Sequence, residues 1–246
     1  MWPLRARPAS FHILGSRVDR VGFSDALNIM LSLVEEPSFH QVVTVNTLML
    51  LAAEQDPVLR QLLSDAALAV PESWGIGWAG RRLRVPLPHF VPGIDLMEAL
   101  CEQAGRRGQS IFLLGSRPGV AEAAVQALVR RYPGLRVAGT HHGYFSRAQE
   151  PEIIEAIRAA APTYLFVGLS MPDQEKWIYR YRASLAARVA MGVGGSFDVL
   201  SGQLHRAPFW MRRLGIEWVY RLMQEPWRWR RIAQLPVFMR KVWLSR

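Results

Sequence analysis

Cysteine, lysine and long apolar runs are scarce in this sequence. Cys101 is the single cysteine among 246 residues, so no disulfide can form within the chain, as is typical of proteins from reducing compartments. No stretch reaches the roughly 20 consecutive apolar residues that a membrane-spanning helix needs. No apolar segment follows Arg5 and Arg7, as it would in a secretory signal. These absences favour a cytoplasmic chain that lies in solution or on a membrane surface.

Charge is unevenly distributed, and 28 of the 30 basic residues are Arg. Residues 205–246 hold ten Arg or Lys against only Glu217 and Glu225, which leaves eight of the ten net positive charges there. The same segment contains Trp210, Trp218, Trp227, Trp229 and Trp243. Arg binds lipid phosphates and indole rings prefer the headgroup depth. We therefore predict a basic helical appendage at 205–246 that associates with an anionic membrane, following a body at 1–204.

The body shows short apolar runs that alternate with longer helical patterns. Strands are predicted at residues 11–14, 41–45, 67–70, 110–114, 136–139, 164–167 and 188–193. Helices are predicted at residues 24–34, capped by Ser24, and at 47–64, 94–106, 118–132, 150–160 and 172–181. This alternation predicts an α/β fold with a Rossmann-like, mostly parallel sheet and helices on both faces. Half of the residues are apolar, enough for a sizeable core.

Four of the predicted strands run into loops of small or polar residues. The loops follow the strands at 41–45, 110–114, 164–167 and 188–193. The carboxyl ends of parallel strands share one edge of the sheet, where ligands bind. Small residues there let backbone N–H groups approach a ligand, and a helix start suits phosphate. One such loop alone is typical of a turn and cap, but four together favour a nucleotide site.

Several longer strings carry a resemblance that covers roughly residues 11–232. They are TVNTLML at 44–50, SWGIGWAGRRL at 73–83, PGIDLMEALC at 92–101, FLLGSRPGVAEAA at 112–124, HGYF at 142–145, VGLSMPDQEKWI at 167–178, GVGGSFDVLSGQLHRAP at 192–208 and GIEWVYRLMQEPWRW at 215–229. This set resembles the WecG/TagA/CpsF family, glycosyltransferase family 26.

The resemblance implies an inverting transfer of N-acetylmannosamine, or a related sugar, from a UDP donor. The implied acceptor is a polyprenyl-diphosphate-linked N-acetylglucosamine at the inner membrane leaflet. The products of such enzymes enter teichoic acid, exopolysaccharide or other cell wall biogenesis. The resemblance also implies a catalytic role for the body at 1–204, and it leaves open whether the chain forms a homo-oligomer.

The resemblance assigns the catalytic centre to three residues. Glu72 stands where the family usually has an Asp that acts as base. Alternatively, Glu72 is an acid that directly precedes Ser73 and caps a helix. Thr44 and Asn46 match a polar pair in the cleft, and strand alternation places them on the same side. We expect this pair to contact sugar or acceptor hydroxyls, although hydrogen bonds within the loop are an alternative.

Further residues are predicted to bind the donor. Gln174 is expected to contact a ligand, whereas Glu175 could serve instead as a first-turn acid at a helix N-terminus. Asp198 could bind a ribose or hold its loop, and the sequence does not separate these roles. Four small residues are expected to bring their backbone close to the nucleotide, namely Gly115, Ser116, Gly194 and Gly195.

Arginines of the appendage match family arginines that reach the diphosphate when the appendage docks. They are Arg221, Arg228 and Arg231, which would share one helix face if Pro226 does not disrupt the helix. A solvated basic face is the alternative. Many family members have an Arg where this chain has Phe90. Either another arginine compensates for this difference or the activity is altered. The candidates are Arg81, Arg82, Arg84 and the arginines of the appendage.

No metal site and no cofactor are expected, and the UDP-sugar acts as a substrate. The sequence has no D-x-D pair, the metal clamp of many sugar-nucleotide enzymes. His141 and His142 would point in opposite directions in an extended chain, which argues against a shared metal.

Three other interpretations remain open. The basic, Trp-rich appendage could bind nucleic acid, since stacking on Trp and Arg–phosphate contacts use the same residues. Against this, the positive charge is confined to the appendage, and we expect no nucleic-acid partner. A nicotinamide dehydrogenase would need a G-x-G-x-x-G turn after the first strand, which is missing. A catalytically degenerate family member is the third alternative, motivated by Glu72 and Phe90.

Overall fold

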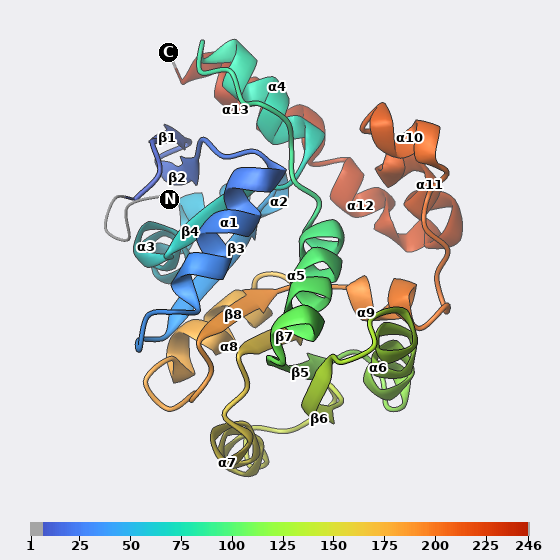
Figure 1. The fold of residues 1–246 in the computed structure, drawn as a ribbon. Helices are drawn as coiled ribbons and strands as arrows, with labels where there is room; N and C mark the ends of the chain where they lie inside the picture. Colours follow the sequence, from blue (N-terminus) through green and yellow to red (C-terminus); the bar gives the residue numbers. More distant parts are fainter. Residues whose placement is uncertain (1–6, 246) are drawn as a thin grey trace.

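The computed structural model describes residues 7–245 and is built around a six-stranded sheet (Figure 1). Its strands are, in spatial order, β4 (Leu68–Pro71), β3 (His40–Val45), β8 (Val189–Gly192), β7 (Tyr164–Gly168), β5 (Ser110–Gly115) and β6 (Arg136–His141). Every neighbouring pair in this sheet is parallel. The predicted α/β class with a parallel sheet is therefore confirmed.

Helices cover both faces of the sheet because alternate strand residues point to opposite sides. Val42 of β3 packs into one apolar cluster and Val43 into another. The first face carries α1 (Phe23–Leu33), α5 (Gly93–Arg107), α6 (Val120–Arg131) and the short α9 (Ser196–Leu200). The second carries α2 (Thr47–Gln55), α3 (Pro57–Asp65), α7 (Glu150–Ala160) and α8 (Asp173–Tyr181).

Some predicted elements are wrong in their bounds. The helix predicted at 47–64 is two helices, because the Asp56 carboxylate accepts the N–H of Leu59 at 3.1 Å and starts α3 anew. Pro57 at the first position favours the same break. Helix α1 begins at Phe23 after Gly22, so Ser24 is not its cap. The strand β2 (Ser16–Asp19) and the helix α4 (Trp74–Arg82) were not predicted.

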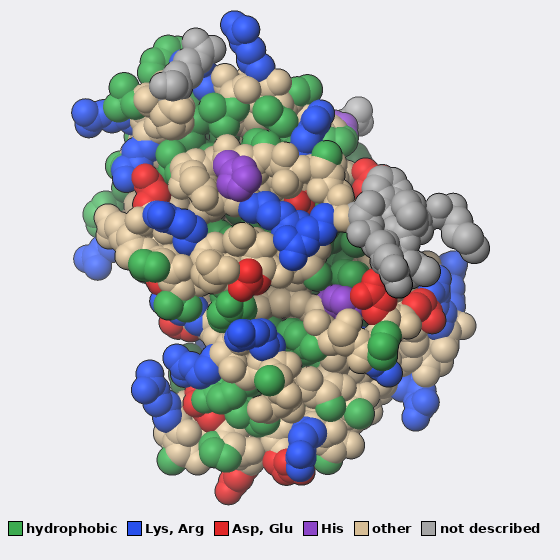
Figure 2. Space-filling model, turned by 90° about the vertical axis from the view of Figure 1, so that its left-hand side faces the viewer, with side chains coloured by type: hydrophobic (Ala, Val, Ile, Leu, Met, Phe, Trp, Pro, Cys, Tyr) green, Lys and Arg blue, Asp and Glu red, His purple; other side chains and the backbone are tan. Residues whose placement is uncertain are grey.

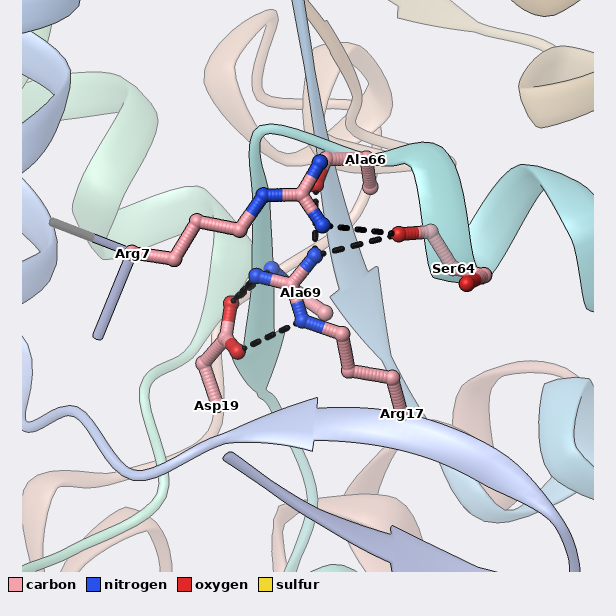
Figure 3. Close-up of polar contacts among 6 residues, drawn as sticks. All are labelled: Arg7, Arg17, Asp19, Ser64, Ala66 and Ala69. Carbon is pink, nitrogen blue, oxygen red and sulfur yellow. Dashed lines mark hydrogen bonds and ion pairs between the residues drawn. The ribbon is translucent and has the colours of Figure 1, made fainter. Parts of the chain in front are cut away.

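The N-terminal strands β1 (Ser10–Ile13) and β2 form an antiparallel hairpin beside β4. Figure 3 shows the polar contacts that hold it there. Buried Arg17 donates to the Asp19 carboxylate at 2.8 Å and to the Ala66 carbonyl, also at 2.8 Å. Asp19 in turn accepts the N–H of Ala69 on β4 at 2.8 Å. The hairpin thereby satisfies a backbone donor that the edge strand would otherwise leave unpaired.

The C-terminal segment folds into a series of short helices. They are α10 (Phe209–Arg213), α11 (Glu217–Gln224), the 3₁₀ turn η1 (Pro226–Arg228), α12 (Trp229–Ile232) and α13 (Leu235–Leu244). Figure 1 shows α13 running alongside α4, away from α10 and α11. None of the helices between residues 7 and 245 has the length and apolar character to cross a bilayer.

Helix α13 belongs to the hydrophobic core rather than to a detached tail. Phe238 and Val242 are both fully buried, in the cluster that includes α2, α3 and the hairpin. Lys241 donates to Glu54 of α2 at 2.8 Å. The guanidinium of Arg82 on α4 lies 4.1 Å from the centre of the Trp243 ring. The end of the predicted appendage is therefore anchored in the body.

Candidate active site

The carboxyl ends of β3, β4, β7 and β8 open into two adjoining cavities. The smaller, of about 530 Å³, contains Glu72 at its wall, and the larger, of about 880 Å³, extends past Ser116. Six residues line both cavities: Leu169, Ser170, Gly194, Gly195, Arg221 and Arg228. This placement at strand ends is the one expected for ligand sites of parallel sheets.

Glu72 follows the last residue of β4, and its carboxylate is held by two neighbouring segments. One oxygen accepts the N–H of Gly93 at 3.2 Å, and the other accepts from the Asn46 amide at 3.4 Å. Burial raises the pKa of Glu72, while hydrogen bonds from Asn46, Gly93 and Thr44 act against the rise. A carboxylate with a raised pKa in a cavity is suited to accept a proton.

The capping alternative for Glu72 is partly realised, but at another helix. Ser73 is the residue before α4, and that helix start has no side-chain cap. The Glu72 carboxylate instead accepts the N–H of Gly93, the first residue of α5. Glu72 therefore both supports a helix start and faces the smaller cavity.

Thr44 and Asn46 lie beside Glu72, as predicted, and both line the smaller cavity. Asn46 has two roles, because its Oδ1 accepts the N–H of Met49 at 3.1 Å while its Nδ2 donates to Glu72. Capping α2 thus fixes the amide that orients the Glu72 carboxylate. Contact with a sugar hydroxyl remains a prediction for both residues.

Gln174 and Glu175 form a buried pair at the start of α8. Gln174 donates to the Glu175 carboxylate at 2.6 Å and accepts the N–H of Gly194 at 2.9 Å. It therefore fixes the loop after β8. Burial raises the pKa of Glu175 to about 7, and its Oε2 has no hydrogen-bond partner within residues 7–245. Both residues line the smaller cavity, and contact of Gln174 with a ligand remains a prediction.

The predicted nucleotide loops occupy different positions. Gly115 lines neither cavity, because it packs against Gly168 so closely that a Cβ would overlap the Gly168 carbonyl. Ser116, in the left-handed region with φ of 57°, lines the larger cavity and donates to Asp198 at 3.1 Å. Asp198 thus ties the loops after β5 and β8 together. A ribose contact by Asp198 remains a prediction.

The three appendage arginines converge on the smaller cavity, although they do not share a helix. Helix α11 ends at Gln224, and η1 and α12 carry the other two arginines. Arg221, Arg228 and Arg231 nevertheless all line the cavity. The guanidinium of Arg221 occupies the space where a Cβ of Gly195 would lie. Because Gly195 has no side chain, it leaves room for Arg221 of the appendage.

Phe90 also lines the smaller cavity, and none of the three nearby arginines compensates for it. Arg81, Arg82 and Arg84 line neither cavity. The Phe90 ring lies 3.4 Å from the position that a Cβ of Gly215 would take, so it contacts the appendage. Of the candidates from the sequence, only appendage arginines reach the cavity.

Two arginines that the sequence did not single out contribute to this region. Arg212 lines the smaller cavity. Arg206 pairs with Asp95 of α5 at 2.5 Å and lies 3.9 Å from Glu217 of α11. It therefore joins the appendage to the body. No local pattern distinguishes these arginines from the others, because the acidic partner Asp95 is more than a hundred positions away.

The expectation that His141 and His142 point apart is wrong. Strand β6 ends at His141, so the chain is no longer extended, and the two ring centres lie 4.6 Å apart. Within residues 7–245 no group of three or more His, Cys, Asp or Glu side chains could hold a metal ion.

Comparisons with known proteins agree with the resemblance. Residues 11–246 match the family model described as "Glycosyl transferase WecG/TagA/CpsF family". The chain is 36% identical to the "N-acetylglucosaminyldiphosphoundecaprenol N-acetyl-beta-D-mannosaminyltransferase" of Staphylococcus aureus strain MW2, over 92% of each chain. The protein with the same description from strain MRSA252 is also 36% identical over 92% of each chain.

Proposed function

The chain belongs to the WecG/TagA/CpsF family of glycosyl transferases, and we propose that it transfers N-acetylmannosamine from a UDP donor to a polyprenyl-diphosphate-linked N-acetylglucosamine. The proposal for the sugar and the acceptor is supported by the names of its relatives. The proposal includes a related sugar on the same donor nucleotide. The observation that carries the proposal is a carboxylate, Glu72, in the same cavity as Arg221, Arg228 and Arg231.

The proposed reaction is a single displacement at C1 of the donor sugar. Glu72 takes the proton from the acceptor hydroxyl while that oxygen attacks C1. The bond between C1 and the diphosphate oxygen breaks on the opposite side, so the configuration at C1 is inverted. UDP leaves with the electron pair of that bond, and guanidinium groups stabilise its new charge.

In this proposal each cavity binds a different part of the donor. The larger cavity, next to Ser116 and Asp198, takes the nucleoside. The smaller cavity, next to Glu72, takes the sugar and the acceptor hydroxyl. Because Arg221 and Arg228 line both cavities, the diphosphate lies between the two halves. Arginine can bind such a group with paired N–H donors.

Neither a metal ion nor a cofactor enters this proposal. The appendage arginines meet the charge of the leaving diphosphate directly. Each guanidinium is permanently charged, so no ion is needed for that role. A test is activity after treatment with a chelator, which we expect to remain unchanged.

We place the protein on the inner face of the plasma membrane, as a peripheral protein held by its C-terminal helices. Large apolar side chains remain exposed there, among them Trp210 at 58% and Trp229 at 59%. At the end of the molecule where α4 and α13 lie, Figure 2 shows Arg and Lys side chains beside hydrophobic ones. Cations and indoles together suit an anionic lipid surface.

The decisive experiment is a donor panel with one acceptor. Purified protein is incubated with different UDP-sugars and a short-chain polyprenyl diphosphate that carries N-acetylglucosamine, and the product is identified by its mass. We expect addition of one N-acetylhexosamine from UDP-N-acetylmannosamine. Transfer of no sugar from any UDP donor would contradict the proposal.

A further inference from the structure

Glu225 lies at the corner between α11 and η1, next to two of the proposed diphosphate ligands. One of its oxygens is 2.9 Å from Nε of Arg221 and 2.6 Å from Nε of Arg228. Its side chain is only 13% exposed. Among the described residues it is the one carboxylate in ion-pair contact with either arginine. The two arginines therefore already have an anion beside them.

The cluster around Glu225 carries more positive than negative charge. Arg221 and Arg228 pair with Glu225, and Arg231 lines the smaller cavity together with both of them. Burial, the charge of Arg221 and, to a smaller extent, that of Arg231 lower the pKa of Arg228. Burial acts to raise the pKa of Glu225, but the hydrogen bonds and charges of Arg221 and Arg228 lower it. Two guanidinium groups paired with one carboxylate leave an excess charge that a diphosphate can neutralise.

A diphosphate between the two cavities would compete with Glu225 for the same two guanidinium groups. Nε of Arg221 donates to Glu225, Nε of Arg228 lies 2.6 Å from the same carboxylate oxygen, and both arginines line both cavities. Two anions that share the same donors repel each other in a partly buried site. Both cannot bind the arginines at full strength.

We propose that Glu225 is an internal counter-ion that Arg221 and Arg228 exchange for the substrate diphosphate. This rests on the proposed function, since it assumes a diphosphate-bearing ligand. In the ligand-free protein Glu225 holds both arginines in position and keeps them from repelling each other. When the ligand arrives, the arginines turn to the diphosphate and the carboxylate loses its pairs.

The exchange also accounts for product release. After transfer, UDP carries more charge than it did within the sugar nucleotide, so the arginines alone would retain it. Glu225 competes for them and lowers the affinity for UDP. A positioning residue of this kind weakens binding of the ligand and speeds turnover where release limits the rate.

The test compares Glu225→Gln with the full-length wild type by calorimetry, using UDP, inorganic diphosphate and uridine as probes. We expect UDP and diphosphate to bind about fivefold more tightly to the variant, because a partly exposed competing ion pair is lost. Uridine should bind equally to both proteins. In steady-state assays UDP should inhibit the variant at lower concentrations, with kcat unchanged or reduced.

The matched control is Glu155→Gln on α7, which removes the same charge from an exposed pair with Arg158. It should alter none of these affinities. Glu225→Asp, which shortens the side chain but keeps the charge, provides a second variant if the amide form does not fold. It should also bind UDP more tightly than the wild type.

Equal or weaker binding of UDP to these variants would overturn the proposal, since Glu225 would then only support the arginines. Tighter binding of uridine as well would also overturn it, because the effect would not concern the diphosphate. Failure of the proposed function has a different signature, namely no sugar transfer by the wild type. Inorganic diphosphate tests the arginine cluster independently of the sugar.

Discussion

Two carboxyl groups with raised pKa line the smaller cavity, but their surroundings differ. Glu72 accepts hydrogen bonds from Gly93 and Asn46, which belong to two other segments. Glu175 is 1% exposed, and one of its oxygens has no partner in the described chain. Hydrogen bonds from Gly93 and Asn46 favour the ionised form of Glu72, which is the form that can accept a proton. Glu175 is better suited to hold Gln174 in place.

The role of Glu72 can be tested with a variant of the same shape. We expect Glu72→Gln to lower kcat by about 10²- to 10⁴-fold, the usual contribution of a general base. Affinity for UDP should not change, because Glu72 does not line the larger cavity. The measurements are product formation by mass and UDP binding by calorimetry.

Glu72→Asp separates chemistry from position, since it keeps the carboxylate but draws it back by one methylene. An intermediate rate is expected. If the amide variant transferred sugar as fast as the wild type, Glu72 would have no part in the mechanism. A wild type that binds UDP but transfers nothing would favour a degenerate family member.

Glu175 makes the stability of the protein depend on pH. Its pKa in the folded protein is about 7, against an ordinary value of 4.5. Below pH 4.5 the carboxyl is protonated in both states, and its burial has no ionic cost. As pH rises toward 7 and above, Glu175 loses its proton readily in the unfolded chain but less readily in the folded protein. The free energy of unfolding therefore falls by up to about 3 kcal/mol.

Glu175→Gln should remove this loss and still accept the hydrogen bond from Gln174. We expect the variant to match the wild type near pH 4.5 and to be more stable at pH 8. Urea denaturation of both proteins across this range gives the difference. Glu152→Gln on the exposed side of α7 serves as a control. The prediction would be contradicted if the free energy of unfolding gained by Glu175→Gln rose no more steeply with pH than that gained by Glu152→Gln.

At the scale of elements, α13 has two unlike faces. Phe238 is fully buried against the body, whereas Val237, its neighbour in sequence, is 48% exposed. We expect Phe238→Ala to lower the free energy of unfolding by about 3–5 kcal/mol, because it leaves a cavity in the core. Val237→Ala should change it by less than about 0.5 kcal/mol. Urea denaturation measures both, and similar losses would show that α13 does not pack as described.

This packing affects how the membrane role should be tested. A chain shortened at residue 204 would lose Phe238 and Val242 from the core cluster and would expose the apolar residues that they cover. Exposed apolar surface can bind vesicles by itself. Substitutions of exposed side chains therefore test membrane binding more cleanly than truncation does.

Local patterns predicted some elements and missed others. Strands β3, β5 and β7 were found because their β-branched and aromatic runs stand out from the flanking turns. Helix α4 was missed because its WGIGWAGRR sequence is rich in Gly and Trp, which are weak helix formers. Its neighbour α13 lies about 160 residues further along the chain, so the packing that stabilises it is invisible to local patterns.

At the scale of the whole molecule, the structure supports a test of membrane against nucleic acid. Trp210 and Trp229 are exposed and line neither cavity. We expect Trp210→Ala with Trp229→Ala to weaken binding to vesicles that contain anionic lipid, and added salt to weaken it further. Flotation of the protein with such vesicles measures both effects.

Val58→Ala is the matched control, because Val58 is 54% exposed and belongs to α3 rather than to the appendage. It should float with vesicles as the wild type does. A gel-shift assay with DNA completes the comparison. Tighter binding to DNA than to anionic vesicles, lost in the same Trp variant, would favour the nucleic-acid interpretation.

The sequence by itself determined the α/β class, the edge of the sheet where the site lies and the family. These depend on periodicity and on ordered strings of residues, which can be read along the chain. It also predicted that Thr44 and Asn46 lie together, since alternation along one strand fixes their side.

Only the tertiary structure decided which charges meet. It brought Arg221, Arg228 and Arg231 to the Glu72 cavity from three separate helical segments, packed Gly115 against Gly168, and paired Arg206 with Asp95. It also buried Phe238 in a cluster with residues of the first hairpin. Most of these contacts join segments far apart in the chain, and their strength depends on burial and distance, which no local pattern contains.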